Sequence, residues 1–291
     1  MRVHLVDGTY ELFRHFFALP SHVDDDGIEV AAVRGVLYSV LTLLEDGATH
    51  VGVANDKVIE SFRNDLYVGY KTGAGIDPAL LAQFPLLDES LVALGLTVWP
   101  MVDQEADDAL AAAAKIAADD RRVEQVLICT PDKDLGQCVV DGRVVQFDRR
   151  KNAMLDEAAV EAKFGVGPAS IPDWLALVGD SADGFPGVPG WGAKSASAVL
   201  ARYHHLDAIP RYAHEWDVDV RGANKLASAL DQNRDNAELF RVLATLRTDA
   251  PVGTVDDWEW TGPRPELEGW ADRLGADRLY TRASKLAAKR A

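Results

Sequence analysis

The chain has 291 residues, of which 48% are hydrophobic and 26% charged, a composition that suits one large or two smaller globular domains. No apolar run is long enough to span a membrane, no signal peptide precedes Asp7, and Cys129 and Cys138 give neither a disulfide framework nor a metal-ligand spacing. The formal net charge of −16 argues against a nucleic-acid-binding protein, unless the charge is segregated or bound metal offsets it. We therefore expect a cytoplasmic protein with no membrane partner.

Short β-type runs alternate with helical patterns along the first half of the chain. Each β-type run ends in polar residues, and the patterns between them have the apolar spacing and length of helices. This alternation predicts an α/β domain with a mainly parallel central sheet and flanking helices. The predicted strands are 3–6, 51–54, 126–130 and 144–147, and the predicted helices include 30–44 and 105–118.

Strand signals stop near residue 166. The rest of the chain is a series of helical segments broken by Gly and Pro clusters such as GDSADGFPGVPGWG, including a polar helical stretch over 221–246. We therefore predict two domains, an α/β domain over 1–165 and a helical region over 166–291. The sequence does not place the final residues, where a Pro-rich break (TGPRPELEG) interrupts weak helical patterns.

Acidic residues follow three of the predicted strands, close to the point where each strand ends. They are Asp7, Asp56, and the pair Asp132 and Asp134. In a parallel sheet, ligands bind beyond the carboxyl ends of the strands, so these side chains are expected at one edge. A further acidic group opens the predicted helix over 105–118 and consists of Glu105, Asp107 and Asp108.

Such a convergence of carboxylates predicts a metal centre. Like charges at close range raise one another's pKa and are destabilising unless cations neutralise them. Oxygen ligands without His or Cys favour Mg²⁺ or Mn²⁺ over Zn²⁺. Each group also has a structural explanation: Asp7 as a turn residue, Asp107 and Asp108 as helix caps, and the pair Asp132 and Asp134 as a solvated loop. Their shared placement at strand and helix ends favours the metal centre.

Six segments give the chain a resemblance to a known family, the 5′-nucleases. That family includes the N-terminal domain of bacterial DNA polymerase I, phage 5′-exonucleases and flap endonucleases. The matching segments run from residue 3 to about residue 252 and are LVDGTYELFR, SFRNDLYVGYK, EADDAL, TPDKDLGQ, GDSADGFPGVPGWGAKSA and LRTDAPV. The resemblance implies a central sheet with flanking helices, then a helix-three-turn-helix DNA-binding region. It also implies divalent-metal-dependent hydrolysis of DNA near 5′ ends, flaps or forks.

The resemblance also assigns roles to single residues. The acids that correspond to the first metal of the family are Asp7, Asp56, Glu105, Asp107 and Asp108, and those for the second are Asp132, Asp134, Asp180 and Asp183. Because every matched position is acidic, we expect a working enzyme with two Mg²⁺ or Mn²⁺ ions. Lys71 corresponds to a lysine that reaches the scissile phosphate, and Arg63 is a second candidate for that contact. A solvated surface charge is the alternative for either cation.

The segment GVPGWGAKSA is similar to the helix-hairpin-helix of the family, which grips DNA without reading its sequence. Gly190 and Gly192 are expected to allow a tight turn with positive φ. Backbone N–H groups at the start of the next helix would then face a phosphate. The proposed contacts are Gly187, Val188, Gly190, Gly192, Lys194 and Ser195, with a second basic pair at Arg221 and Lys225. The family also seats K⁺ at this hairpin, and the basic tail over 282–290 is expected to be a frayed, solvated end.

The chain departs from the family pattern at a few positions. Ala74 stands where members usually have an arginine, and the segment over 71–90, which forms the arch over single-stranded 5′ ends, has no Lys or Arg after Lys71. Instead it carries Asp77, Asp88 and Glu89, while Gly184 stands where bacterial members commonly have Asn. These changes put the threading of long 5′ strands in doubt more than hydrolysis.

Three other functions remain open on sequence alone. A haloacid-dehalogenase-type phosphatase begins with a strand followed by DxD, but Asp7-Gly8-Thr9 lacks the second acid. A PIN-type ribonuclease shares the acidic sheet edge and usually lacks the hairpin. A catalytically weak or inactive DNA-junction-binding protein would share the whole fold. We expect a standalone, monomeric nuclease of DNA replication or repair, nucleoid-associated in a bacterium, because no polymerase segment is present.

Overall fold

The computed structural model describes residues 1–290, which form two compact units. The sheet unit contains Met1–Ile59, Gly73–Thr130 and the chain from Thr248 onward, and the helical unit contains Glu60–Thr72 and Pro131–Arg247. Each unit is thus assembled from segments that are separated in the sequence. The domain boundary expected between residues 165 and 166 divides the chain differently and stays a prediction.

The sheet unit is built on four parallel strands in the order β3-β2-β1-β4. In the register of the sheet, Val3 of β1 lies between His50 of β2 and Val126 of β4. Apolar side chains fill the strands because helices cover both faces, as is usual for parallel sheets. The strands are β1 (Arg2–Asp7), β2 (His50–Asp56), β3 (Thr97–Met101) and β4 (Gln125–Cys129).

The sequence analysis missed β3, which contains Pro100 and was not expected to be a strand. Proline cannot donate to a sheet, but β3 pairs only with β2 on one side and lies at the end of the parallel set, where one row of N–H groups needs no partner. The strands predicted over 3–6, 51–54 and 126–130 are confirmed as β1, β2 and β4.

Helices cover the parallel strands in layers. α1 and α5 pack on β2 from one side with α2 against them, and the alanine-rich α6 packs on all four strands. Because crossovers between parallel strands are right-handed, the reversal from β3 back to β4 puts α6 on the opposite face. The bounds are α1 (Gly8–Ala18), α2 (Ala31–Glu45), α4 (Pro78–Leu81), α5 (Gln83–Ala93) and α6 (Ala106–Asp119).

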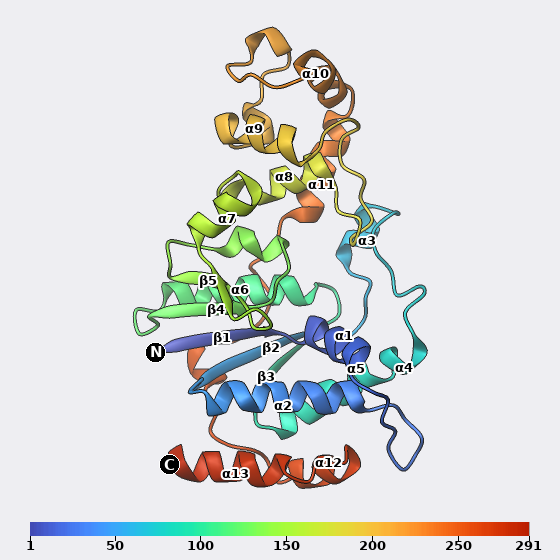
Figure 1. Ribbon diagram of the computed structural model, residues 1–291, viewed down its shortest axis with the longest axis vertical. Coiled ribbons are helices and arrows are strands. Elements are labelled where there is room, and N and C mark those ends of the chain that lie inside the picture. Colours follow the sequence, from blue (N-terminus) through green and yellow to red (C-terminus); the bar gives the residue numbers. More distant parts are fainter. Residues whose placement is uncertain (291) are drawn as a thin grey trace. The chain divides into compact units, whose positions relative to one another are not determined.

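An outer layer is formed by the C-terminal residues, which contain η5 (Val255–Trp258), α12 (Leu267–Arg273) and α13 (Leu279–Arg290). α13 packs on α2 and α12 on α5 (Figure 1). The expectation of a frayed basic tail is therefore wrong. Arg282 pairs with Glu45, and the Arg290 guanidinium donates to the carbonyl oxygens of Leu44 and Ala48, so that it satisfies the C-terminal end of α2.

The helical unit has one short antiparallel hairpin, and the rest of its regular structure is helical. The predicted polar helix over 221–246 is two helices, because Asn233 takes a non-helical conformation (φ −121°) and ends one helix where the next begins. The elements are α3 (Phe62–Leu66), η1 (Asp134–Cys138), β5 (Val144–Asp148), β6 (Ala153–Leu155), α7 (Glu157–Phe164), η2 (Pro168–Ser170), α8 (Ile171–Val178), α9 (Ala193–Tyr203), η3 (Leu206–Ala208), η4 (Ala213–Glu215), α10 (Ala223–Gln232) and α11 (Arg234–Ala244).

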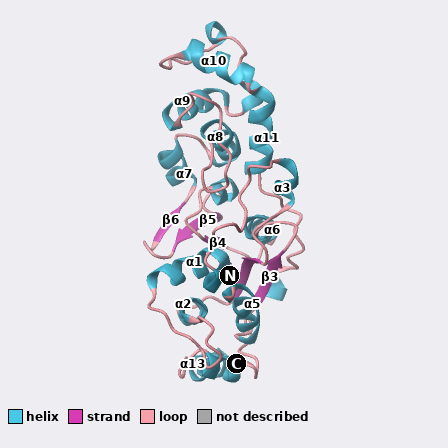
Figure 2. Cartoon of the chain, turned by 90° about the vertical axis from the view of Figure 1, so that its right-hand side faces the viewer, coloured by secondary structure: helices cyan, strands magenta, loops and turns pink. Residues whose placement is uncertain are grey.

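The core of the helical unit surrounds α8. This helix is apolar on most of its circumference, and α9 and α11 pack against it, as Figure 2 shows. Phe240 of α11 lies with its ring centroid 5.6 Å from both Tyr67 and Phe185. The core thus fixes the chain on either side of α8, including the acidic loop that comes after it. Within residues 1–290, no helix has the length and apolar character needed to cross a bilayer.

Candidate metal centre and nucleic-acid interface

The acids of the sheet unit lie at the carboxyl ends of its strands. Asp7 ends β1, where its carboxylate accepts from the backbone N–H of Tyr10 (2.8 Å) and from the hydroxyl of Thr130 (2.9 Å). It thereby caps α1, whereas the structural alternative for this residue was a turn. Its neighbour in the sheet is Ala54 of β2, two residues before Asp56.

Asp56 connects the end of β2 to the start of α6. Its N–H donates to Thr9 Oγ1, and its Oδ1 accepts from the N–H of Ala106, both at 2.8 Å. At the same helix end, the N–H of Glu105 donates to Asp108 Oδ2 (3.0 Å) in a capping box. The fold therefore brings together Asp56, Glu105 and Asp108, while Asp107 is half-buried in the first turn of α6.

A second acidic group forms within the helical unit. Asp134 begins η1, and Asp180 and Asp183 lie in the loop after α8. One carboxylate oxygen from each lies within 4.8 Å of the others, and all three residues are buried. The loop is held by its own backbone, since Asp180 N–H donates to Phe185 O (2.8 Å) and Ala182 N–H donates to Asp180 Oδ1 (2.9 Å).

The carboxylate of Asp134 lies in surroundings that disfavour its negative charge. Burial raises its pKa well above the ordinary aspartate value, and the charges of Asp132, Asp183 and Asp180 raise it further. Its Oδ1 is buried without a hydrogen-bond partner among residues 1–290. A divalent cation would supply the missing partner and the missing positive charge, so the donor set fits a hard metal ion. Asp132 is exposed and lies outside this close group, although its Oδ1 accepts from Asp134 N–H (3.1 Å).

Two lysines pair with the acidic group of the helical unit. Lys71 Nζ lies 3.0 Å from Asp183 Oδ1, and the Lys71 N–H donates to the Asp183 carbonyl (2.9 Å). Lys133 Nζ lies 2.6 Å from Asp180 Oδ2. Burial lowers the pKa of Lys133, but the bond to Asp180 and the nearby charges of Asp134 and Asp132 outweigh that effect and raise it. Lys133 thus stays an ammonium group at neutral pH.

Gly184, one of the departures from the family pattern, lies against the segment that carries Lys71. It has φ +87°, and a Cβ at this position would lie 2.2 Å from the carbonyl oxygen of Gly69. A larger residue would therefore push the 69–71 backbone away from Asp183. Glycine at this position is what allows the observed approach of Lys71.

Arg63 is buried, with 1% of its surface exposed. Its Nε donates to the carbonyl of Leu243 (2.8 Å) and its Nη2 to that of Thr245 (3.2 Å), at the end of α11. This arrangement favours a structural role for Arg63. Contact with a phosphate stays a prediction, and the burial of the guanidinium argues against it.

The predicted hairpin forms the turn before α9. Gly190 has φ +83°, as expected, but Gly192 is extended (φ −149°), so the expectation of a positive φ at Gly192 is wrong. Gly187 has φ +72°, and a Cβ there would lie 2.6 Å from the carbonyl oxygen of Leu177. Val188 is buried in the core of the unit rather than lying on the surface.

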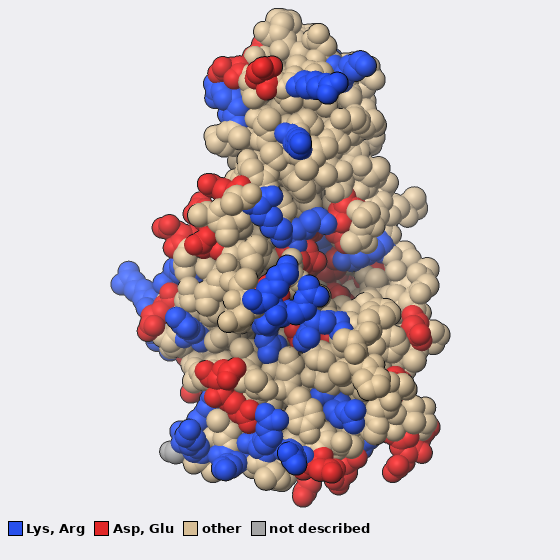
Figure 3. Space-filling view, viewed as in Figure 1, with Lys and Arg blue, Asp and Glu red and all other residues tan. Residues whose placement is uncertain are grey.

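The cations of the predicted DNA contact are exposed. Lys194 lies in the first turn of α9, where the Ser195 hydroxyl and the Gly192 backbone form a cap, with N–H donation to Ser195 Oγ at 3.1 Å. Arg221 and Lys225 flank Gly222, which has φ +80° and begins α10. Two glycine-led helix starts thus carry basic side chains. Figure 3 shows clusters of Lys and Arg on one face, with Asp and Glu side chains beside several of them.

Sequence reasoning missed two polar residues at the acidic group of the helical unit. Gln146 of β5 is buried, and its Nε2 donates to the Asp132 carbonyl at 2.5 Å. Lys133 was visible between two aspartates but was treated as part of a loop. The signal that could have identified Lys133 is its position between two candidate metal ligands, Asp132 and Asp134.

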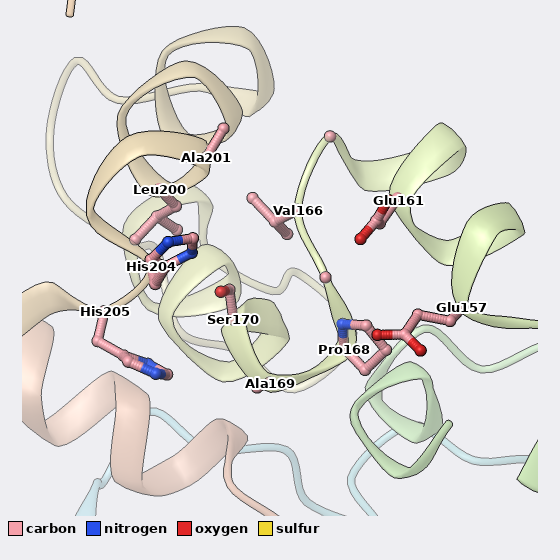
Figure 4. A pocket seen from close by; sticks show the side chains of 12 residues that line it. Glu157, Glu161, Val166, Pro168, Ala169, Ser170, Leu200, Ala201, His204 and His205 are labelled. Atoms are coloured by element: carbon pink, nitrogen blue, oxygen red, sulfur yellow. The ribbon is translucent and has the colours of Figure 1, made fainter. Parts of the chain in front are cut away.

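A pocket of about 560 Å³ lies elsewhere in the helical unit, between α7, η2 and α9. Figure 4 shows Glu157 and Glu161 on one side, with His204 and His205 on the other. His205 Nδ1 lies 2.9 Å from Asp173 Oδ2, which is buried. The lining includes none of the predicted site residues, so the pocket is separate from the acidic group.

Comparison with known proteins gives the same assignment over most of the chain. A family model described as the N-terminal resolvase-like domain of 5′-3′ exonucleases matches residues 2–165, and the model for their C-terminal SAM fold matches residues 166–266. The chain is 36% identical over 274 residues to DNA polymerase I of Pseudomonas aeruginosa. That match covers 91% of this chain and 29% of the polymerase, so the chain spans less than a third of this relative.

Solved structures of nucleases share the fold. The bacteriophage T5 flap endonuclease, in a complex with DNA and metal ions, superposes with a TM-score of 0.66 at 18% identity and covers 99% of this chain and 100% of that chain. Flap endonuclease-1 from Methanococcus jannaschii gives a TM-score of 0.61 at 16% identity and covers 100% of this chain and 93% of that chain. The predicted α/β fold followed by a helical region is confirmed, and the chain belongs to the 5′-3′ exonuclease family.

Proposed function

We propose that this protein hydrolyses phosphodiester bonds in DNA near 5′ ends, flaps or forks, independently of sequence, with divalent cations bound to its acidic groups. The observation that carries the proposal is the group of Asp134, Asp180 and Asp183, buried within 4.8 Å of one another. Asp134 Oδ1 lacks a hydrogen-bond partner in the described chain, which a structural carboxylate would have. Membership of the exonuclease family supplies the reaction class.

We infer that each acidic group holds one Mg²⁺ or Mn²⁺ ion. The ligands come from Asp7, Asp56, Glu105, Asp107 and Asp108 in the sheet unit, and from Asp132, Asp134, Asp180 and Asp183 in the helical unit. When bound, such cations activate water as a nucleophile and stabilise negative charge on the phosphoryl oxygens. The carboxylates serve as ligands in this scheme, so none of them needs to act as a general acid.

Lys71 is the protein's own cation for the phosphate. Its backbone and its side chain are both bound to Asp183, which fixes the ammonium group beside the acidic group of the helical unit. A fixed cation stabilises the charge that develops on the phosphoryl group and loses little entropy when it does so. Arg63 is buried and donates to the Leu243 carbonyl, so we assign it a structural role rather than contact with the phosphate.

DNA is the proposed substrate because the T5 relative binds DNA and metal ions and because the hairpin before α9 presents backbone N–H groups with Lys194. Arg221 and Lys225 would extend the contact along the backbone. These contacts read phosphates only, which predicts binding without sequence preference. K⁺ at the hairpin carbonyls, action as a monomer, and a place in DNA replication or repair in the cytoplasm belong to the same proposal.

The test is cleavage of a labelled 5′-flap duplex in Mg²⁺. We expect products with the wild type, none in EDTA, and at least about hundredfold slower cleavage by Asp134→Asn with Asp180→Asn. Binding of the same duplex in Ca²⁺ should persist in the double variant. Asp235→Asn, an exposed acid of α11, is the matched control and should cleave normally. Duplex binding without cleavage by the wild type would identify a DNA-junction-binding protein instead.

A further inference from the structure

Lys133 is the one residue between Asp132 and Asp134, and its side chain forms an ion pair with Asp180. Its Nζ lies 2.6 Å from Asp180 Oδ2, and its side chain is 33% exposed, against 4% for Asp180. Its backbone is fixed by the turn that starts η1, where the Gly136 N–H donates to the Lys133 carbonyl (3.0 Å). The ammonium group is therefore held at the acidic group by a rigid piece of backbone.

Both oxygens of Asp180 already have partners inside the protein. Oδ1 accepts the Ala182 N–H at 2.9 Å, and Oδ2 receives the Lys133 ammonium. A divalent cation that binds Asp180 Oδ2 has to displace Lys133 or share this oxygen with it, and one that binds the remaining lone pair of Oδ1 meets the ammonium group across the same carboxylate. In each case two positive charges lie at one carboxylate, and their repulsion weakens the binding of the metal.

We propose that Lys133 is a built-in counter-cation of the Asp134, Asp180 and Asp183 group, which stabilises these carboxylates and competes with the divalent metal for Asp180. The inference rests on the proposed function, because that function supplies the metal. It assigns Lys133 the role of a positioning residue that sets how tightly the helical unit binds its cation.

The competition has consequences of opposite sign for two measurements. Removing the ammonium charge takes away a competitor, so the metal should bind more tightly. It also leaves Asp180 beside Asp134 and Asp183 without its partner, so the protein in EDTA should unfold at a lower temperature. A lysine that only helps to bind DNA, or one that is merely solvated, would produce neither effect.

The experiment compares Lys133→Gln and Lys133→Met with the wild type. Mn²⁺ binding is measured by calorimetry without DNA, and thermal unfolding is measured in EDTA and in Mn²⁺. We expect binding about tenfold tighter in both variants, a lower Tm in EDTA, and a larger rise of Tm on adding Mn²⁺ than in the wild type. Gln keeps a hydrogen-bond donor for Asp180, so it guards against a folding failure of the Met variant.

Lys151→Met is the matched control, because Lys151 pairs with the buried Asp148 at 3.4 Å in the same unit. It should leave Mn²⁺ affinity unchanged. In an Asp180→Asn background, Lys133→Gln should no longer alter the Tm in EDTA. Weaker or unchanged Mn²⁺ binding by folded Lys133→Gln would overturn the inference. Failure of the wild type to bind Mn²⁺ would instead overturn the proposed function.

Discussion

The acidic groups of the two units differ in the hydrogen bonds and ion pairs that the protein provides to their carboxylates. In the sheet unit, Asp7 and Asp56 accept bonds from backbone N–H groups at the starts of α1 and α6. In the helical unit, Asp134 Oδ1 has no described hydrogen-bond partner, and Asp180 is paired with a lysine. The first group is therefore stable as part of the fold, whereas the second needs positive charge. An acid can be a structural cap and a candidate ligand at once, so capping does not decide against metal binding.

The largest effect should come from substituting one acid of each group. We expect Asp7→Ala and Asp134→Asn both to slow cleavage by at least about hundredfold. Their effects on folding in EDTA should have opposite signs. Asp7→Ala loses the acceptor that caps α1 and should cost about 1 kcal/mol of unfolding free energy, whereas Asp134→Asn removes a buried carboxylate that neighbouring charges repel and should stabilise the fold. Thermal unfolding in EDTA checks this, and a lower Tm for both variants would contradict the proposed difference between the two acidic groups.

Lys71→Ala should slow catalysis although it leaves every candidate carboxylate ligand in place. Because a cation aimed at the phosphoryl group acts mainly in the transition state, the single-turnover rate should fall about a hundredfold, with little change in duplex affinity. Gly184→Ala should also lower the single-turnover rate, because a Cβ there would lie 2.2 Å from the Gly69 carbonyl oxygen and displace Lys71. Rates within twofold of the wild type for Lys71→Ala would exclude a catalytic role for this residue.

The hairpin offers a change that touches neither acidic group. Gly190→Val should weaken duplex binding by about tenfold, because valine resists φ +83°. Gly192→Ala should bind normally, because this residue is extended and no atom lies within 4 Å of the added Cβ. Mn²⁺ binding by both variants should match the wild type. Equal duplex affinity of the Gly190→Val and Gly192→Ala variants, measured by titration, would show that the turn does not contribute to DNA binding.

The pH dependence of the free energy of unfolding should reveal the raised pKa of Asp134. Its pKa is raised above 3.8 in the folded protein, first by burial and then by neighbouring aspartates. Because the folded protein holds this proton more tightly than the unfolded chain, stability in EDTA should fall as pH rises from the ordinary aspartate pKa through the raised one, and this contribution should then stay constant. The difference between the wild type and Asp134→Asn, followed by urea unfolding across pH, isolates that fall. No pH dependence of the difference would mean that the carboxylate is solvated.

The smallest effect is expected at Ala74. Arginine there would restore the usual cation of the family, so cleavage of long single-stranded flaps should rise a few-fold more than cleavage of nicked duplex. The structure leaves less of the segment over 71–90 available to contact a 5′ strand. Asp88 accepts a hydrogen bond from Asn55 Nδ2 (2.6 Å), and Phe84 and Leu87 of α5 are buried. Rates on flaps of graded length at two salt concentrations check this, and equal gains on every substrate would exclude a role in handling the 5′ strand.

The sequence predicted features that depend on local pattern. Strands β1, β2 and β4, helices α2 and α6, and the acids at strand ends all follow from periodicity and from the geometry of parallel sheets. Features set by distant partners were not predictable. From the sequence, Arg63 was expected to contact a phosphate or to lie on the surface. It is instead buried and donates to the carbonyl of Leu243, which lies 180 residues further along the chain. The extended conformation of Gly192 depends on its cap with Ser195, which the Gly-x-Gly spacing does not reveal.

The division of the sheet unit has a consequence for synthesis. Its outer layer, α12 and α13, comes from the last part of the chain, and Arg290 closes the end of α2. The segment Pro131–Arg247, which forms most of the helical unit, emerges from the ribosome before that layer exists. The helical unit can therefore fold while the sheet unit still exposes the sides of α2 and α5 that α13 and α12 will cover. The sheet unit therefore begins to form before the helical unit and is completed after it.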